Sequence, residues 1–312
     1  MFGAYTRLTP VVDAQQKILS EQFIDSIIHD ITAELIHFRK QFDQVWKNGY
    51  SAELPEDKNQ FLQAKNNRIK KKFSNQFLSQ YPLGQCFHLT STVVEFIEEF
   101  ELQNENSIFY TVKSFIDNGG IFKKIWGVYN NDHFQTAIQI GNWYIDIAAD
   151  TFEIQEKQVE FCLFNDSKFS PVTSIEQYNS ILENTENKKL YLNTIFPNLW
   201  PYFPFFIKNN AKNIYSIPDS KYLSGLCTKD NFHLLKDYLL NPHSEGISNE
   251  SRNLILGKFS DKKEKYIQKN FLEISDLTKD DLFSYLKTSG LNKADTLKAV
   301  NYINFILKSK SF

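Results

Sequence analysis

Hydrophobic residues recur every three to four positions along residues 14–48. The apolar members of this pattern are Ile18, Phe23, Ile24, Ile27, Ile28, Ile31, Leu35, Ile36, Phe38, Phe42, Val45 and Trp46. Charged and polar residues fill the positions between them, which is the pattern of an amphipathic helix. One or two helices that pack on a core are therefore predicted here, and a turn at residues 54–57 precedes a second helical stretch.

The middle of the chain predicts a helix and then a sheet. Residues 81–84, Tyr-Pro-Leu-Gly, interrupt the helical spacing, which resumes over residues 85–100. Cys86 therefore falls in the first turn of a buried helix. Runs rich in β-branched and aromatic residues follow, separated by short Asn and Gly turns, at 121–129, 133–140 and 143–148. They predict a three-stranded antiparallel meander, to which residues 159–164 add a candidate strand.

The pattern divides the chain into three segments: N-terminal helices over residues 1–80, a core over 81–206 and a helical accessory module over 207–312. The core ends in the run NTIFPNLWPYFPFF at 193–206, whose prolines exclude a regular helix. We interpret this run as a packed, extended connector, with a surface for a hydrophobic or peptide partner as the alternative. Amphipathic segments beyond residue 216, with a helix start signal at 276–281, predict the helical module.

Composition and charge are those of a globular protein. The chain has 312 residues, of which 42% are hydrophobic and 23% are charged, and its formal net charge is −2. This balance argues against a partner recognised mainly by neutralisation of phosphates, so no nucleic acid is expected. No apolar run is long enough for a membrane span, and the first residues lack the pattern of a secretory signal. We therefore expect a soluble, cytoplasmic protein, with export by a non-classical route left open.

The three cysteines, Cys86, Cys162 and Cys227, favour free thiols. They lie too far apart for metal-ligand pairs of the CxxC type, and their odd number does not fit a disulfide framework. The histidines of the first helix and of the C-terminal module have no metal-ligand partner at a useful spacing, and no glycine-rich phosphate or dinucleotide motif occurs. We expect no metal and no cofactor.

Cys86 is the candidate for covalent chemistry. Unpaired backbone N–H groups and the positive end of the dipole at a helix N-terminus stabilise a thiolate and lower its pKa, and the same N–H groups can hold an oxyanion. A thiolate nucleophile also needs a base, and the base needs a third group that orients it. His133 begins a predicted strand and Asp146 lies in the next strand. The sequence therefore contains the parts of a Cys-His-Asp triad.

These residues resemble a known family. Gly84-Gln85-Cys86-Phe87 resembles the segment around the nucleophile of transglutaminases. The His133 strand, the tight turn, Trp143 and the Asp146 strand resemble the second and third motifs of the transglutaminase-like superfamily. The resemblance covers about residues 82–152. It implies an α+β, papain-like core in which the nucleophile helix packs on an antiparallel sheet, with Cys86 as nucleophile, His133 as general base and acid, and Asp146 as the group that orients His133.

The sequence departs from the family pattern at two points. Gln135 stands where the family has an aromatic residue, and the spacing from His133 to Asp146, 146 − 133 = 13 residues, is shorter than usual. If residues 141–142 are the centre of the hairpin turn, Ala137 lies opposite Asp146 and His133 lies opposite Asp150. A turn centred one residue earlier sets Asp146 opposite Gln135 and diagonal to His133, as the family pattern would require. We favour Asp146 as the acid because its strand matches better, and Asp150 is the alternative.

The resemblance implies thiol-dependent acyl transfer or amide hydrolysis on the glutamine side chains of a protein or peptide. Water as the acceptor gives deamidation, and an amine gives transamidation. Gln85 is a candidate for the second oxyanion donor, beside the backbone N–H of Cys86. Two alternatives remain: a papain-like cysteine peptidase, and a non-catalytic interaction module with a residual triad.

Overall fold

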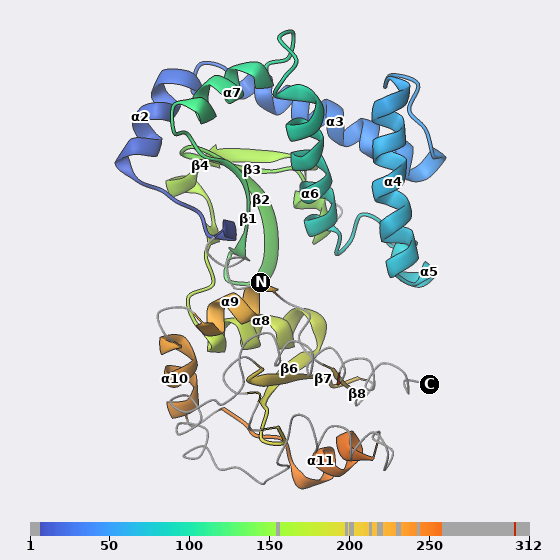
Figure 1. The fold of residues 1–312 in the computed structure, drawn as a ribbon, viewed down its shortest axis with the longest axis vertical. Coiled ribbons are helices and arrows are strands. Elements are labelled where there is room, and N and C mark those ends of the chain that lie inside the picture. The colour runs from blue at the N-terminus through green and yellow to red at the C-terminus, as the bar shows by residue number, and fades with distance from the viewer. Residues whose placement is uncertain are drawn as a thin grey trace. The chain divides into compact units, whose positions relative to one another are not determined.

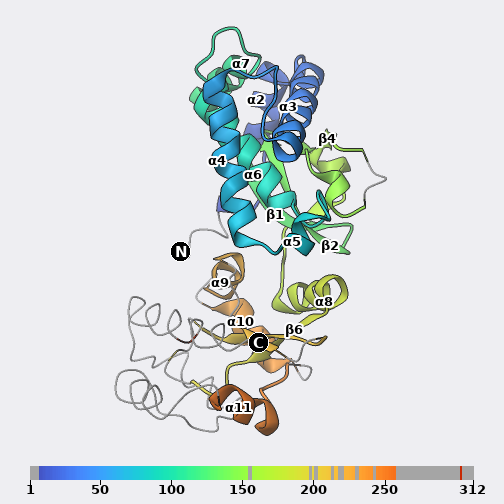
Figure 2. The same ribbon diagram turned by 90° about the vertical axis from the view of Figure 1, so that its right-hand side faces the viewer.

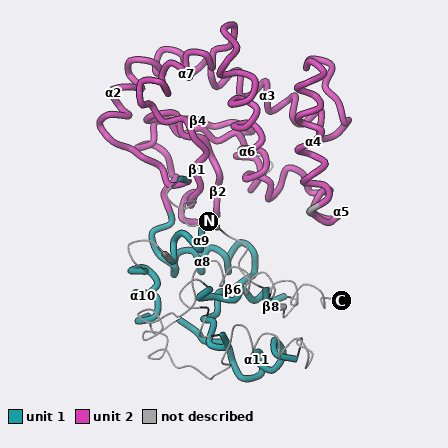
Figure 3. The backbone as a smooth tube through the Cα atoms, in the orientation of Figure 1, with its two compact units in different colours: residues 1–7, 172–312 teal, residues 8–171 magenta. Residues whose placement is uncertain are grey.

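The computed structural model describes residues 7–153, 157–196, 199, 203–211, 214–216, 221–228, 232–241, 244–257 and 303. The chain forms two compact units, one of residues 8–171 and one of residues 1–7 with 172–312 (Figure 3). This division differs from the three expected segments, because the N-terminal helices share one core with the strands that follow them. The border falls at residues 171 and 172, within the segment expected to be a single core.

The unit of residues 8–171 begins with the predicted helices. Asp13 caps the first of them by accepting a hydrogen bond from the backbone N–H of Gln16, and Gly49 ends the long second helix in a left-handed conformation with φ of 77°. Two of the helices carry the apolar pattern of residues 14–48, and the helix that begins at Cys86 continues into a π-helical turn. The helices are α2 (Ala14–Phe23), α3 (Ile28–Asn48), α4 (Glu56–Lys72), α5 (Asn75–Leu78), α6 (Cys86–Phe96), the turn η1 (Ile97–Glu101) and α7 (Phe109–Asp117).

The predicted meander is confirmed as the centre of a mixed α+β unit. The antiparallel sheet has the order β4-β3-β2-β1-β5, and the candidate strand near residue 160 forms its edge. Its strands are β1 (Phe122–Tyr129), β2 (His133–Ile140), β3 (Trp143–Asp146), β4 (Glu160–Leu163) and β5 (Phe169–Ser170). Gly141 has a φ of 56° in the turn between β2 and β3, a conformation that favours glycine.

The register of β2 and β3 decides which side chains meet. Ile140 pairs with Trp143 and Ile138 with Ile145, so the turn is centred on residues 141–142. Continuing this ladder sets Ala137 beside Asp146. The first of the two registers considered from the sequence is therefore correct, and the register that sets Asp146 opposite Gln135 is wrong.

The two faces of the sheet pack against different layers. Helix α6 lies along β2 and β1, with α4 against α6 (Figures 1 and 2). On that face Ile138 and Ile145 join the core formed with the helices. On the opposite face Ala137 and Tyr144 belong to a smaller cluster with Ile125, Phe164 and Phe169. Adjacent residues of β2 therefore face different layers.

The unit of residues 1–7 and 172–312 contains a sheet as well as helices. Its antiparallel strands are β6 (Lys188–Leu192), β7 (Phe205–Asn209) and β8 (Ile214–Ser216), and its described helices are α8 (Ile175–Glu186), α9 (Lys221–Thr228), α10 (His233–Leu240) and α11 (Asn249–Leu256). The expectation that 207–312 is wholly helical is thus wrong, because β8 and most of β7 lie within it. In the run at 193–206 the phenylalanines that the structure describes, Phe196, Phe203, Phe205 and Phe206, are buried as expected.

The helix start signal at 276–281 lies outside the described residues. Among the helices of the described ranges, none has the length and apolar character needed to cross a membrane.

Candidate functional site

The Cys86 thiol lies where the sequence predicts it, at the first residue of α6. The side chain is half-buried, and its Sγ donates to the hydroxyl of Thr136 in β2 at 3.8 Å. The hydroxyl of Thr90, one turn along α6, donates to the carbonyl oxygen of Thr136 at 3.0 Å. These two contacts fix the start of α6 against the middle of β2.

The protonation state of this thiol differs from the expectation. Burial raises the pKa of Cys86, and the negative charge of Asp146 adds to the increase, while hydrogen bonds from Thr136 oppose it. The expected lowering of the pKa by the helix N-terminus is therefore outweighed by the loss of solvation. At neutral pH the thiol of this arrangement is protonated and is a poor nucleophile until a base removes its proton.

Asp146 is buried at the end of β3 and is held by three donors. Its carboxylate accepts from Nε2 of Gln135 at 2.6 Å, from the backbone N–H of Ala148 at 2.8 Å and from the hydroxyl of Tyr144 at 3.2 Å. Burial raises the pKa of Asp146 to about 7, against the effect of these hydrogen bonds. Asp146 therefore titrates close to neutral pH, as groups at functional sites often do.

Gln135, rather than His133, is the partner of Asp146. Because Ala137 lies opposite Asp146, Gln135 is its diagonal neighbour across the strands, and His133 is one pleat further away. Four residues of strand separate His133 from the position opposite Asp146, which is about 13 Å along the strand. The pairing of His133 with Asp146 that the sequence predicts is absent from the described structure, because the register does not support it.

His133 is held by aromatic contacts at the beginning of β2. Its ring stacks on Phe152 with a centroid distance of 3.7 Å and an angle of 5°, and lies 5.6 Å from the ring of Tyr129. Its Nδ1 is 3.3 Å from the carboxylate of Asp132. Within the described residues, no hydrogen bond joins His133 to Cys86.

The three triad candidates are therefore not assembled in the described structure. Thr136 and Gln135 are adjacent in β2, so their side chains leave the strand on opposite faces. The thiol is bonded on the Thr136 side, and Asp146 is bonded on the Gln135 side. Asp146 nevertheless affects the pKa of Cys86, so the carboxylate lies within electrostatic reach of the thiol.

Asp150, the alternative acid, has a structural partner. It lies in the 3-10 turn η2 (Ala149–Thr151), and its two oxygens accept from the guanidinium of Arg39 at 2.9 Å each. Arg39 is only 1% exposed. A carboxylate in this bidentate, buried pair is neutralised by arginine, so Asp150 is not placed to orient an imidazole.

Arg39 also connects the segment of Asp150 to the loop before Cys86. Its Nε donates to Asp43 at 3.0 Å, and the hydroxyl of Tyr81 donates to the same carboxylate. The loop is bonded to η2 as well, because the backbone N–H of Gly84 donates to the carbonyl oxygen of Thr151 at 2.8 Å. The buried arginine therefore fixes both segments that flank the thiol.

The contact of Gln135 with Asp146 and that of Arg39 with Asp150 were not predicted from the sequence. The register with residues 141–142 at the turn already makes Gln135 the diagonal neighbour of Asp146, and this signal was available. Arg39 had no such signal, because its partner Asp150 is 111 residues away in the chain.

Gln85 precedes α6 and is almost completely buried, with 1% of its surface exposed. Its backbone carbonyl oxygen accepts from the N–H groups of His88 and Leu89, while its side-chain nitrogen has no hydrogen-bond partner in the described structure. A buried donor without a partner is costly, so this nitrogen is available to a group that reaches it.

The pKa values of the other two cysteines are raised as well. Burial raises the pKa of Cys162, with Asp166 and Glu160 adding to the increase, and burial alone raises that of Cys227. The described residues contain no group of three or more His, Cys, Asp or Glu side chains placed to hold a metal ion.

Comparisons with protein-family models, with curated proteins and with solved structures found no match to this chain.

Proposed function

We propose that this protein catalyses thiol-dependent acyl transfer or amide hydrolysis, with Cys86 as the nucleophile and a glutamine side chain of a protein or peptide as the acyl donor. The observation that carries the proposal is the half-buried thiol at the first residue of α6, packed against the sheet that also carries His133 and Asp146. This arrangement fits a transglutaminase-like, papain-like core.

The surroundings of the thiol suit attack on a carbonyl group. The N-terminus of α6 provides backbone N–H groups and the positive end of a helix dipole, which stabilise a developing oxyanion. The unpartnered side-chain nitrogen of Gln85 is adjacent in the chain and would supply a second donor. Both groups favour a tetrahedral intermediate at Cys86.

The reaction needs a base, because the thiol is protonated. In the described structure His133 lies on the Gln135 face of β2, whereas the Cys86 sulfur is bonded on the Thr136 face. In the proposed mechanism the beginning of β2 rearranges when substrate binds, so that His133 takes the proton of Cys86 and Asp146 bonds His133 in place of Gln135. The Cys86 sulfur attacks the carboxamide carbon, and a thioester forms as the carbon–nitrogen bond breaks.

The protonated His133 gives its proton to the departing ammonia, and water or an amine then attacks the thioester. Attack by water is deamidation and attack by an amine is transamidation. The same steps on a peptide bond are those of a papain-like peptidase, so the loops around Cys86 decide between these outcomes.

Release of ammonia from a glutamine-containing dipeptide tests this proposal. We expect release with the wild-type protein in the presence and absence of an added primary amine, and a loss of at least about 100-fold in Cys86→Ala, as for removal of a covalent nucleophile. Cys162→Ala is the matched control and should retain activity. Activity that survives in Cys86→Ala would overturn the proposal.

A non-catalytic interaction module is the second candidate, and one observation favours it. Asp146 is fully bonded by Gln135, Tyr144 and Ala148, none of which can act as a general base. If this is the working state of the site, the ammonia assay will give no signal with any variant, and Cys86 will react with iodoacetamide no faster than Cys162.

A further inference from the structure

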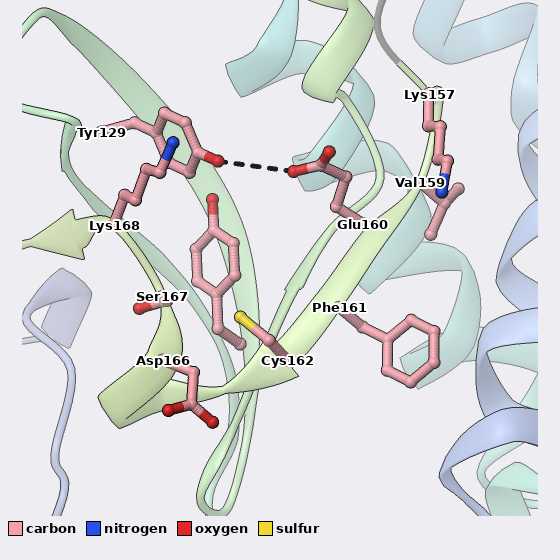
Figure 4. Close-up of a pocket in the computed structure, with 10 residues that line it drawn as sticks. Tyr129, Lys157, Val159, Glu160, Phe161, Cys162, Asp166, Ser167 and Lys168 are labelled. Carbon is pink, nitrogen blue, oxygen red and sulfur yellow. Dashed lines mark hydrogen bonds between the residues drawn. The ribbon is translucent and has the colours of Figure 1, made fainter.

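A pocket lies on the face of the sheet that is opposite α6. Its floor is formed by side chains of three strands, Tyr129 of β1, Tyr144 of β3, and Glu160 and Cys162 of β4 (Figure 4). Residues 166–168 form one wall. The pocket has a volume of about 320 Å³, which is at the lower end of the range for small-molecule sites.

Four charged side chains line this pocket. They are Lys157, Lys168, Glu160 and Asp166, and Figure 4 shows the two lysines on opposite sides of Glu160. Within the described ranges of the chain none of the four belongs to an ion pair, although oppositely charged groups line the same cavity. Glu160 accepts only the hydroxyl of Tyr129, at 3.5 Å. The pocket thus presents two ammonium groups and two carboxylates.

The remaining lining is aromatic. The rings of Tyr129 and Tyr144 lie 6.4 Å apart and nearly parallel, with an angle of 23° between them. Tyr144 is buried, with 1% of its surface exposed, and its hydroxyl bonds Asp146, so it supports the pocket from below. The ring of Tyr129 is half-buried, and an apolar group of a ligand would pack against it.

We propose that this pocket binds a small zwitterion of the α-amino acid class with an apolar side chain. The ammonium group of the ligand pairs with Glu160 or Asp166, its carboxylate pairs with Lys157 or Lys168, and its side chain lies against the Tyr129 ring. A ligand with both charges satisfies both sets of groups, whereas a simple anion or cation leaves one set facing a like charge. The site does not depend on catalysis at Cys86.

Cys162 provides a reporter for this site. It is half-buried on the pocket floor, and Cys86, which lies on the other side of the sheet, is an internal control in the same sample. The rate of alkylation by N-ethylmaleimide is followed at each cysteine by peptide mass spectrometry, with L-phenylalanine as the probe. We expect L-phenylalanine to lower the alkylation rate of Cys162 at least about fivefold at saturation, with no change in the rate at Cys86.

Two analogues test the need for both charges in the wild-type protein. L-Phenylalaninamide lacks the carboxylate and 3-phenylpropionate lacks the ammonium group, and neither should protect Cys162 at the same concentration. Glu160→Gln and Lys168→Ala should each raise the L-phenylalanine concentration that gives half of the protection of Cys162 at least about tenfold. Lys113 lies outside the pocket, so Lys113→Ala should not change this concentration. No protection by L-phenylalanine, or equal protection by either analogue, would overturn the proposal.

Discussion

Replacing the buried arginine of residues 8–171 provides the strongest test of how this unit is held together. Arg39 is 1% exposed and donates four hydrogen bonds, two to Asp150, one to Asp43 and one to the carbonyl oxygen of Ile147. In Arg39→Met the methionine fills part of the space, but the carboxylate of Asp150, which is 5% exposed, loses its bidentate partner. The main effect is therefore an uncompensated buried charge.

The expected loss of unfolding free energy is about 3–5 kcal/mol, the usual cost of removing one partner of a buried ion pair. That is a large part of the roughly 5–15 kcal/mol by which a domain is stable. Urea denaturation followed by tryptophan fluorescence measures it, since three of the four tryptophans lie in residues 8–171. The neighbouring Lys40 is exposed, so Lys40→Met is the matched control and should change stability by less than about 0.5 kcal/mol.

A double variant separates the charge effect from a packing effect. Arg39→Met with Asp150→Leu removes both charges and should recover at least about 2 kcal/mol relative to Arg39→Met alone. A single variant within about 0.5 kcal/mol of wild type, or a double variant that is no more stable than the single one, would refute the assignment of Arg39 as the charge that holds Asp150.

Three further predictions concern the sheet and the thiol. The pKa of Asp146 is about 7 when folded and about 3.9 when unfolded, so its protonated form favours folding. As the pH rises from roughly 4 to 7, the unfolding free energy of the wild type relative to Asp146→Asn should fall by on the order of 1 kcal/mol per pH unit; unfolding free energies from urea denaturation that run parallel with pH in the two proteins would disprove this. Gln135→His places an imidazole beside Asp146 but on the face of β2 opposite the Cys86 thiol, and should leave the alkylation rate of Cys86 at neutral pH unchanged; faster alkylation, measured by peptide mass, counts against the assignment of these side chains to opposite faces. Gly127→Ala places a Cβ 2.3 Å from the carbonyl oxygen of Ser170 and should cost about 1–3 kcal/mol, measured by urea denaturation; wild-type stability would contradict the packing of β5.

Local patterns were sufficient to predict most elements of residues 8–171. The three-to-four spacing of apolar residues over 14–48 became α2 and α3, and the short Asn and Gly turns marked the meander. These features depend on neighbours in the chain, so they are readable from the sequence. The division of the chain was not, because whether helices share a core with later strands depends on tertiary packing.

The site was predicted only in part, because some of its features depend on neighbours in the chain and others depend on tertiary packing. The start of α6 at Cys86 follows from local signals, but the partner of Asp146 depends on a register that a one-residue shift would change. Both registers were consistent with the alternation of side chains. The family resemblance favoured the one that brings His133 to Asp146, and the structure has the other, so Gln135 takes the contact.

The protonation of Cys86 was mispredicted because the sequence reveals a helix N-terminus but not the depth of burial. Desolvation of a buried thiol raises its pKa by more than a helix dipole lowers it. Burial on the Thr136 side of β2 therefore decided the direction of the shift.

The most direct test of the central claim is the rate of covalent modification of Cys86 by a glutamine-directed electrophile at neutral pH. Intact-mass and peptide analysis of the wild type and of His133→Ala measure it, with Cys162 as the internal reference. We expect a single adduct at Cys86, formed at least about tenfold more slowly in His133→Ala. Equal rates in the two proteins, or modification of Cys162 as fast as that of Cys86, would contradict it.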